Sequence, residues 1–400
     1  MRSMTVVIIT LLQLSWASAQ DWAPVPVADL KGWTVLSGEW AVEKGALVGR
    51  APNEMAWIML DGEYADFEVE FDFETPTPSN GGLQFRSHWL PKLPLAEGAD
   101  PLSAPRQMYG YQANVETRER GATGRLVDEN GRGPLAQASA EASKTVKQKT
   151  SNHMRVVARG DTIEVYLNEV LANQTKDEAY IKGRLALQIM PNVEGQPTAE
   201  VFYRNIRLKD LGRTGEWRSL FDGTSFDGWK PYGSEAWSIE DGVIVGRSGP
   251  KKSEGYLATE EQFKDFRVRG TFKMLGEGNF GLFYHSTIKL DEKDYPVISG
   301  VQGEVEPNYP SATGWVYESY KRGWLVKPDP NTVGALALRP GEWNELEIRS
   351  QGNHITTWVN GVRTLDFTDA EPQLFEGSFA LQLHTGGVDG IQWKDLYVLK

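Results

Sequence analysis

Residues 67–73 read FEVEFDF, in which apolar residues alternate with acidic ones. Successive side chains of a β-strand point to opposite faces, so this alternation predicts a strand with one face in a core and the other in water. Residues 266–272, FRVRGTF, show the same alternation, and so do the shorter runs 163–167 and 345–349. We therefore expect the chain to be built from half-buried β-strands throughout.

Turn residues separate these strand-like runs. Asn168-Glu169 and Asn360-Gly361 lie between paired runs and predict tight hairpins, and Asn-Gly is the stronger signal for a type I′ turn. The 41 glycines and 21 prolines of the chain divide it into short segments. Residues 135–146 are the one stretch for which we expect a short helix. The pattern as a whole predicts an all-β protein made of antiparallel β-sandwiches of the jelly-roll type.

The second half of the chain repeats the first half with a period near 190 residues. Residues 110–116, GYQANVE, return as residues 300–306, GVQGEVE, 190 positions later. A period of this length is far longer than a solenoid repeat, so each copy is expected to be a complete domain with its own core. Further matched segments are 122–124 with 312–314, 40–50 with 237–247, 80–86 with 279–285 and 183–190 with 377–384.

These matches predict two tandem domains, at residues 20–212 and 216–400, joined by a short polar stretch. Four hundred residues suit two domains of ordinary size. The chain has no cysteine, so each domain must be stabilised by its own core without disulfides. A net charge of −12 argues against a nucleic-acid partner, because phosphates require a basic surface.

Residues 1–19 have the features of a secretory signal peptide. Arg2 precedes an apolar run at 4–14, and small residues at 17–19 form an Ala-x-Ala pattern. The apolar run is too short to span a bilayer. We therefore expect cleavage after Ala19, a periplasmic or secreted mature protein, and no membrane insertion once the signal is removed.

A set of short motifs resembles the 3-keto-disaccharide hydrolase family. Residues 217–223, WRSLFDG, followed by Gly228-Trp229, are similar to the opening signature of that family. The resemblance covers nearly the whole mature chain, once per copy. It implies a concanavalin-like jelly-roll sandwich and action on glycosides whose C3 hydroxyl has been oxidised to a ketone. The other motifs that carry it lie at 82–86, 110–114, 127–129, 359–361 and 381–384.

The implied reaction requires three chemical groups. A C3 ketone acidifies the hydrogen on C2, so a base can remove that hydrogen and expel the C1 substituent by β-elimination. Hydration of the resulting 2-hydroxy-3-keto-glucal completes a net hydrolysis. The site therefore needs a base near C2, a cation or hydrogen-bond donor for the enolate oxygen, and an acid for the leaving group.

The second copy offers candidates for all three groups. We expect Glu304 to be the base and Arg322 to stabilise the anion. His384 and His285 are expected to be acids or metal ligands. Alternate residues of a regular strand share a face, so Glu304 and Gln302 are expected side by side. The remaining candidates of this copy are Glu318 for catalysis and Gln302, Tyr317 and Trp315 for substrate binding.

The first copy differs at three of these positions. Asn114 stands where the second copy has Glu304, Met190 stands in place of His384, and Arg86 in place of His285. An amide cannot act as a general base and a thioether cannot act as an acid, so turnover is expected in the second copy. The first copy can still bind sugar or use another carboxylate as its base. Its expected substrate-binding residues are Arg86, Gln112, Asn114, Asp128, Glu129 and Arg132.

Other interpretations of the same residues stay open. His285, Glu304 and His384 offer mixed nitrogen and oxygen ligands for a divalent metal ion, although their spacing resembles no compact metal motif. A lectin-like protein that only binds carbohydrate would need an exposed aromatic platform, for which the candidates are Trp315, Tyr320 and Trp324. An ordinary glycosidase would need two carboxylates about 5–9.5 Å apart, for which the candidates are Glu304 and Glu318.

Overall fold

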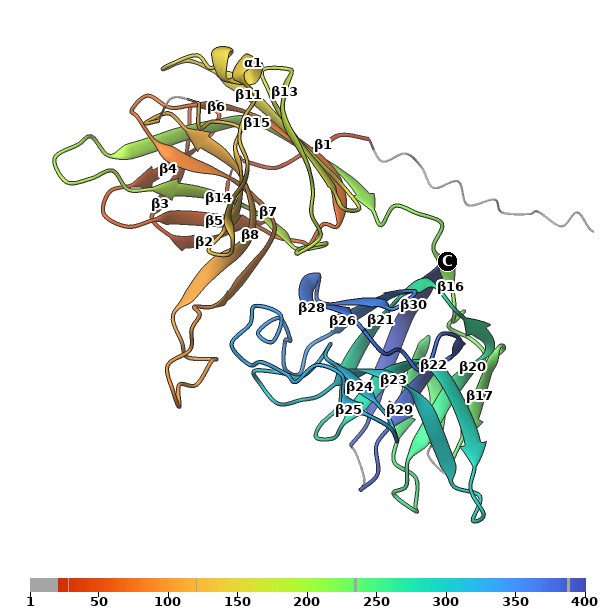
Figure 1. Cartoon of the computed structure of the whole chain (residues 1–400). Helices are drawn as coiled ribbons and strands as arrows, with labels where there is room; N and C mark the ends of the chain where they lie inside the picture. Colours follow the sequence, from red (N-terminus) through yellow and green to blue (C-terminus); the bar gives the residue numbers. More distant parts are fainter. Residues whose placement is uncertain (1–20, 28, 120, 234–235, 387–388) are drawn as a thin grey trace, which may run out of the picture.

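Two β-sandwich domains follow one another along the chain (Figure 1). The computed structural model describes residues 21–27, 29–119, 121–233, 236–386 and 389–400. Each domain consists of an eight-stranded and a seven-stranded antiparallel sheet packed face to face. The expected all-β class, with two tandem jelly-roll sandwiches, is confirmed. The expected signal peptide at 1–19 lies outside the described residues.

The first domain spans β1 to β15. In its eight-stranded sheet the order is β13 (Val170–Lys176), β12 (Thr162–Leu167), β11 (Asn152–Arg159), β6 (Asp66–Glu74), β15 (Ala199–Gly212), β4 (Ala46–Ala51) and β3 (Glu39–Glu43), with β1 (Ala23–Pro24) beside β15. In its seven-stranded sheet the order is β10 (Gly133–Ala136), β9 (Leu126–Glu129), β8 (Arg106–Glu116), β7 (Asn80–Pro91), β14 (Arg184–Met190), β5 (Ala56–Leu60) and β2 (Trp33–Ser37).

The second domain repeats this arrangement. In its eight-stranded sheet the order is β18 (Ala236–Glu240), β19 (Val243–Arg247), β30 (Ile391–Leu399), β21 (Phe266–Met274), β26 (Asn344–Gln351), β27 (His354–Val359) and β28 (Val362–Thr368), with β16 (Arg218–Ser219) beside β30. In its seven-stranded sheet the order is β17 (Trp229–Tyr232), β20 (Gly255–Phe263), β29 (Gly377–Leu383), β22 (Phe280–Leu290), β23 (Pro296–Val305), β24 (Val316–Glu318) and β25 (Gly323–Trp324).

The alternating strands supply the cores. On β6 the side chains of Phe67, Val69, Phe71 and Phe73 are all buried between the two sheets of the first domain. Burying one such side chain contributes about 1.5–3 kcal/mol to folding. β21 alternates in the same way in the second domain. β6 and β21 belong to the eight-stranded sheets. The seven-stranded sheet that packs against each of them therefore has an inner face toward the core and an outer face on the opposite side.

The two expected hairpins are confirmed. Asn168-Glu169 joins β12 to β13, and Asn360-Gly361 joins β27 to β28. All four residues have positive φ angles, of 46°, 68°, 51° and 84° in sequence order. Two consecutive residues with positive φ are the requirement of a type I′ turn, whose twist matches that of the flanking strands.

The short helix occupies less of residues 135–146 than its pattern indicates. Residues up to Ala136 belong to β10, which pairs with β9, and the helix α1 covers only Ala140–Lys144. Ser139 caps this helix, because its Oγ accepts a hydrogen bond from the backbone N of Ala142 at 3.2 Å. No helix within the described ranges is long and apolar enough to cross a membrane.

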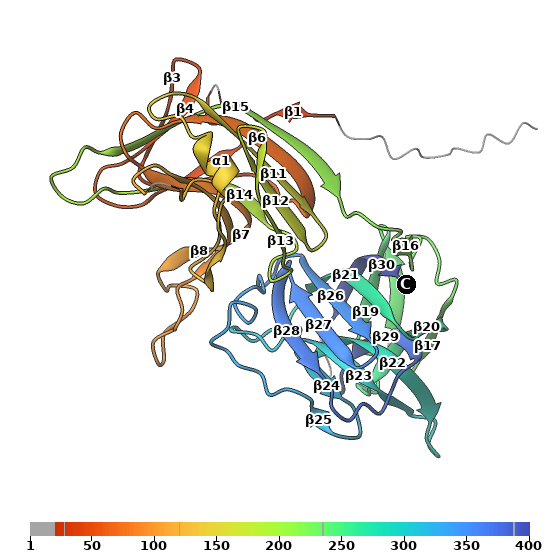
Figure 2. The same ribbon diagram turned by 45° about the horizontal axis from the view of Figure 1, so that its top comes forward.

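The domains are docked through the segment that follows β13 and the start of β28 (Figure 2). Tyr180 forms an antiparallel bridge with Val362, and the amide of Ile181 donates to the carbonyl of Gly361 at 2.8 Å. In the connecting segment, Arg213 is almost buried and pairs with two glutamates of β26. The linker is therefore held in place by the second domain.

Candidate functional site

Polar side chains line the outer face of the seven-stranded sheet in the second domain. The register places Gln382 of β29 and Glu304 of β23 on either side of Gly281 of β22. Their sequence neighbours Leu383 and Val305 are fully buried in the core. Because alternate residues of a strand face opposite ways, Gln382 and Glu304 point away from that core.

Gln302 connects the members of this row. Its Nε2 donates to Oε1 of Gln382 at 2.8 Å, to Oε2 of Glu304 at 3.1 Å and to the carbonyl of Phe280 at 3.0 Å. The amide crosses β22 directly above Gly281, where a Cβ atom would collide with it. Glycine is therefore required at position 281 so that the glutamine can lie flat over the strand.

Glu304 is a buried carboxyl with a strongly shifted pKa. Its side chain is 5% exposed, and its Oε2 also accepts a hydrogen bond from Nδ2 of Asn279 at 3.0 Å. Burial raises the pKa of Glu304 to about 8, Asn279 partly offsets this effect, and the charge of Glu306 adds to it. A carboxylate with this pKa is a much stronger base than an ordinary glutamate and is poised near neutral pH.

His384 lies at the end of the same row. It follows β29 directly, and its backbone N donates to the carbonyl of Asn279 at 3.3 Å. Its imidazole is exposed, with Nδ1 3.2 Å from the carbonyl of Thr385. Asn279 therefore contacts both Glu304 and His384. Asn279 was not predicted as a site residue, although Asn80 at the matched position of the first copy was a signal for it.

Aromatic residues lie along one side of the row. Tyr317 of β24 is paired with Gln302 and makes an edge-to-face contact with the exposed Trp324, with ring centroids 5.4 Å apart. The ring of Tyr320 is also exposed. Trp315 is 5% exposed, and its carbonyl accepts a hydrogen bond from the backbone N of Glu304 at 2.9 Å. Tyr317, Trp324 and Tyr320 thus offer apolar surface beside the polar row.

Glu318 and Arg322 are not brought together with Glu304. Glu318 is paired with Val301, a core residue, so its fully buried carboxylate points to the inner side of the sheet. Arg322 bonds to Glu318 and to both carboxylate oxygens of Asp369, at 2.9 and 2.7 Å. This corrects the expected roles of Glu318 and Arg322, and it also separates the two carboxylates that an ordinary glycosidase would use.

The first domain contains the same ion-pair cluster of one arginine and two carboxylates. Arg132 bonds to Asp128 at 2.6 Å and to the two oxygens of Asp177 at 2.7 and 2.9 Å. Asp128 is buried and paired with Tyr111, which is a core residue. The repeated arginine, expected to contact the ligand, is therefore held by two carboxylates in each domain, and its side chain stays partly exposed.

Arg86 and His285 occupy matched bulges and also point inward. Both have positive φ, 47° and 49°, at a register shift in β7 and β22 respectively. Arg86 is fully buried and pairs with Asp66 at 2.9 Å. His285 is 3% exposed, with Nε2 2.7 Å from the carbonyl of Lys264. Neither side chain lies on the outer face that carries the polar row.

The structure therefore does not assemble the expected metal ligands. His285 contacts the aromatic rings of Phe266 and Tyr284 on the inner side of the sheet, while Glu304 and His384 belong to the outer row. In the part of the chain that the structure describes, no group of three or more His, Cys, Asp or Glu residues is close enough to hold a metal ion.

The outer face of the first domain has a matching pair of glutamines. Nε2 of Gln112 donates to Oε1 of Gln188 at 2.9 Å, and Oε1 of Gln112 accepts from Gln84 at 2.7 Å. Asn114 is 7% exposed and occupies the position of Glu304, beside Gly82. Met190 at the end of β14 carries no titratable group, as expected from the sequence.

With this geometry in hand, the chain can be compared with known proteins. The family described as 3-keto-alpha-glucoside-1,2-lyase-like domain matches residues 27–209 and again 216–399. The chain belongs to this family. The resemblance inferred from the short motifs is thereby confirmed, and two domains of this family follow one another in the chain.

Two curated proteins are similar to parts of these lyase-like domains. A 3-keto-disaccharide hydrolase from Bacteroides thetaiotaomicron is 36% identical over 167 residues, which are 37% of this chain and 57% of that protein. A levanase from Bacillus subtilis is 25% identical over 176 residues, or 42% of this chain and 22% of that protein. The chain thus matches little more than half of the first relative and about a fifth of the second.

Solved structures align with about half of the chain. A putative glycosyl hydrolase from Parabacteroides distasonis is 22% identical and covers 46% of this chain and 92% of its own, with a TM-score of 0.34. The carbohydrate-binding module CBM66 from Bacillus subtilis is 21% identical and covers 45% of this chain and 96% of its own, with a TM-score of 0.34.

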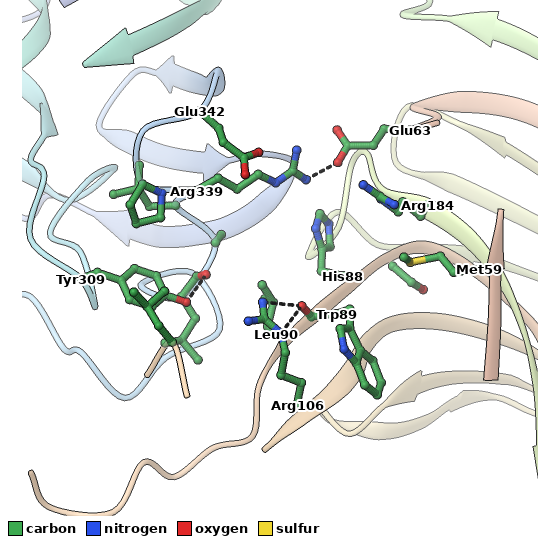
Figure 3. A pocket seen from close by; sticks show the side chains of 16 residues that line it. Met59, Glu63, His88, Trp89, Leu90, Arg106, Arg184, Tyr309, Arg339 and Glu342 are labelled. Atoms are coloured by element: carbon green, nitrogen blue, oxygen red, sulfur yellow. Dashed lines mark hydrogen bonds and ion pairs between the residues drawn. The ribbon is translucent and has the colours of Figure 1, made fainter. Parts of the chain in front are cut away.

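A separate pocket lies between the two lyase-like domains (Figure 3). It has a volume of about 470 Å³, and Arg339 of the second domain pairs with Glu63 of the first across it. His88 lines it with Nε2 2.9 Å from the carbonyl of Lys182, and burial lowers the pKa of His88 to about 4. The residues of the polar row around Glu304 do not line this pocket.

Proposed function

We propose that the second domain cleaves 3-keto-glycosides by removing the proton on C2 of the oxidised sugar. The observation that carries this proposal is the buried Glu304, whose pKa is raised to about 8 on the outer face of a sheet. A fixed carboxylate of this basicity suits the abstraction of a proton that a neighbouring ketone has acidified. Membership of the 3-keto-alpha-glucoside-1,2-lyase-like family supports the same chemistry.

The proposed reaction has two stages. The Glu304 carboxylate takes the C2 proton, the electrons of the C2–H bond form the C1=C2 double bond, and the C1–O bond breaks. The leaving oxygen receives a proton from His384, so that an alcohol departs. Water then adds its hydroxyl to C1 and a proton to C2. The sum of the two stages is hydrolysis of the glycosidic bond.

The proposed donors for the enolate oxygen come from the outer face, because Arg322 is already paired with Glu318 and Asp369. The Nδ2 group of Asn279 uses one of its two protons on Glu304. Its second proton and the hydroxyl of Tyr317 are the proposed donors. A donor aimed at the developing charge is worth about 10²- to 10³-fold in rate.

The setting of this reaction is proposed from the sequence. The features of residues 1–19 support export to the periplasm or the outside of the cell. The proposed partner is a 3-keto-glycoside made by an enzyme that oxidises the C3 hydroxyl of a sugar. Binding of an unoxidised carbohydrate along Tyr317 and Trp324, without turnover, is the competing function.

The test is a comparison of matched substrates. A disaccharide and its 3-keto form are incubated with the full-length protein, and release of the C1 substituent is followed. We expect release from the 3-keto form alone, and about a 100-fold loss of that activity in Glu304→Gln. Glu292→Gln, on the exposed hairpin between β22 and β23, is the matched control. Equal turnover of the unoxidised disaccharide would indicate an ordinary glycosidase, and saturable binding without release a lectin-like protein.

A further inference from the structure

The outer face of the first domain carries a carboxylate that the second domain lacks. Glu129, the last residue of β9, accepts a hydrogen bond from Nε2 of Gln188 at 3.3 Å. The position that matches it, 190 residues later, is Ser319. The first domain thus has no carboxylate at the position on β8 that matches Glu304 of β23, but it has one on the neighbouring strand β9.

Both domains hold their carboxylate on the same frame. In each, a glutamine amide lies over a glycine, Gly82 or Gly281, where a Cβ atom would collide with it. In each, that amide donates to a second glutamine two strands away, at 2.9 Å in the first domain and 2.8 Å in the second. The polar frame of the outer face is therefore common to the two copies.

The carboxylates contact opposite ends of this frame. Glu304 accepts its hydrogen bond from Gln302 on β23, whereas Glu129 accepts from Gln188 on β14. Each therefore has a side-chain amide donor that fixes the direction of its oxygen atoms. Asn114 stands at the position of Glu304 and is uncharged, so it does not repel the carboxylate of Glu129 on the same face.

The surroundings of Glu129 make it a stronger base than an exposed glutamate. Burial raises the pKa of Glu129, the hydrogen bond from Gln188 partly offsets this, and the charge of Asp128 adds to the rise. Asp128 itself points inward to Arg132 and cannot reach the outer face. Among the two carboxylates of β9, Glu129 alone is placed to meet a ligand there.

We propose that the first domain is a second centre for the removal of the C2 proton, with Glu129 as its base. This inference rests on the proposed function of the second domain. Since Met190 replaces His384, the first domain has no acid at that position for the departing oxygen. Its substrates are therefore 3-keto-glycosides whose leaving group is stable as an anion, such as phenols.

The bonds in this centre change as follows. Glu129 takes the C2 proton, the C1=C2 double bond forms, and the C1–O bond breaks to release a phenolate. The phenolate takes a proton from water at neutral pH, and protonated Glu129 returns its proton to solvent. Water then adds across C1=C2. Such a leaving group needs no protein acid, so the absence of the histidine does not block the reaction.

Full-length variants separate the two centres. With 4-nitrophenyl 3-keto-glucoside, Glu304→Gln is expected to retain at least a tenth of the wild-type rate. The double variant Glu304→Gln/Glu129→Gln is expected to be about 100-fold slower on this substrate than Glu304→Gln alone. With a 3-keto-disaccharide, Glu129→Gln is expected to change the rate less than 2-fold. Glu169→Gln, on an exposed hairpin of the same domain, is the control, and melting curves confirm that all variants are folded.

A substitution that introduces a carboxylate at position 114 separates a catalytic from a structural role of Glu129. Asn114→Glu, added to the double variant, places a carboxylate where the second domain has Glu304, and it is expected to restore at least 10-fold of the aryl activity. Equal rates of Glu304→Gln and the double variant would overturn the inference while leaving the proposed function in place. A wild-type protein that is inactive on both keto substrates would overturn the proposed function.

Discussion

The side-chain amide of Asn279, the residue directly before the neighbouring strand β22, donates a hydrogen bond to Oε2 of Glu304 at 3.0 Å. Burial raises the pKa of Glu304 to about 8, and this bond works in the opposite direction because it favours the charged form. Asn279 therefore controls the pH at which Glu304 becomes a base.

Asn279→Ala is expected to move the pH dependence of cleavage upward. In the wild-type protein, kcat/KM for a 3-keto-disaccharide should rise with pH and level off above about pH 8, as Glu304 loses its proton. Loss of a hydrogen bond to a charged group, worth about 1.5–3 kcal/mol, should raise the midpoint by about 1 to 2 pH units. Asn308→Ala, whose amide contacts Glu306, should leave the midpoint unchanged. A midpoint that stays in place in Asn279→Ala would contradict the assignment of Glu304 as the base.

Glu304 should also make the stability of the second domain depend on pH. Its folded pKa of about 8 exceeds the ordinary value of 4.5, so the folded state binds a proton that the unfolded state releases. The free energy of unfolding should therefore fall as the pH rises from about 4.5 to 8, by about 3–5 kcal/mol. Thermal melting at pH 5 and pH 8.5 tests this. Glu304→Gln should melt like the wild type at pH 5 and at a higher temperature at pH 8.5; a constant difference would contradict the shift.

His384→Gln tests the proposed acid through the leaving group. If His384 protonates the departing oxygen, its loss should lower kcat on a 3-keto-disaccharide by about 100-fold. The same substitution should lower kcat on 4-nitrophenyl 3-keto-glucoside less than 5-fold, because nitrophenolate departs without a proton. An equal loss on both substrates would show that His384 has another role, such as binding the sugar. The partly exposed His354, on β27 of the other sheet, provides the control, as His354→Gln.

The sequence predicted the strands and hairpins because their signals are local. Alternation at 67–73 and the turn at Asn360-Gly361 depend only on residues close in sequence. The same parity places Tyr317 outward and Glu318 inward, so the inward direction of Glu318 was predictable once Tyr317 was assigned to the outer face. The choice of Glu304 and Gln302 as neighbours on one face followed from this rule and agrees with the register.

The bulges and the domain contacts were not predictable in this way. Arg86 and His285 each lie where one strand gains a residue relative to its partner, which turns the side chain toward the interior. No local sequence pattern indicates such an insertion. The pairing of Arg213 with β26 depends on residues more than 130 positions apart, and Glu129 reaches Gln188 across two intervening strands.

Arg86→Met is expected to destabilise the first domain without affecting the proposed centre around Glu304 in the second domain. The guanidinium is fully buried and pairs with Asp66, which also accepts from the backbone N of Gly160 at 2.8 Å. Its removal leaves a buried carboxylate without its cation, which costs about 3–5 kcal/mol. Calorimetry should show a lower melting temperature for one of two domains, while cleavage of a 3-keto-disaccharide at 15 °C should be retained. Loss of that cleavage in the folded variant would contradict a purely structural role.

Arg213→Met is expected to weaken the docking of the domains in a pH-dependent way. Its guanidinium lies 2.6 Å from Oε1 of Glu345 and 3.1 Å from Oε2 of Glu347. Burial alone would raise the pKa of Glu345, but Arg213, Lys182 and other cations lower it to about 2. A lowered folded pKa stabilises the protein above pH 4.5, and this contribution of about 3 kcal/mol is lost as the pH falls from 4.5 toward 2.

The measurement is thermal melting of wild type and variant between pH 7 and pH 3. At pH 7 the variant should melt at a clearly lower temperature, because buried Glu345 loses its nearest cation and buried Glu347 keeps only Arg267. The difference in melting temperature between wild type and variant should become smaller toward pH 3, where Glu345 starts to take up a proton in the variant. Arg204→Met is the matched control: its pair with Glu74 is about one-third exposed, so its loss should cost less than about 1 kcal/mol at any pH. A difference in melting temperature that stays constant with pH would show that Arg213 acts through packing rather than through its charge.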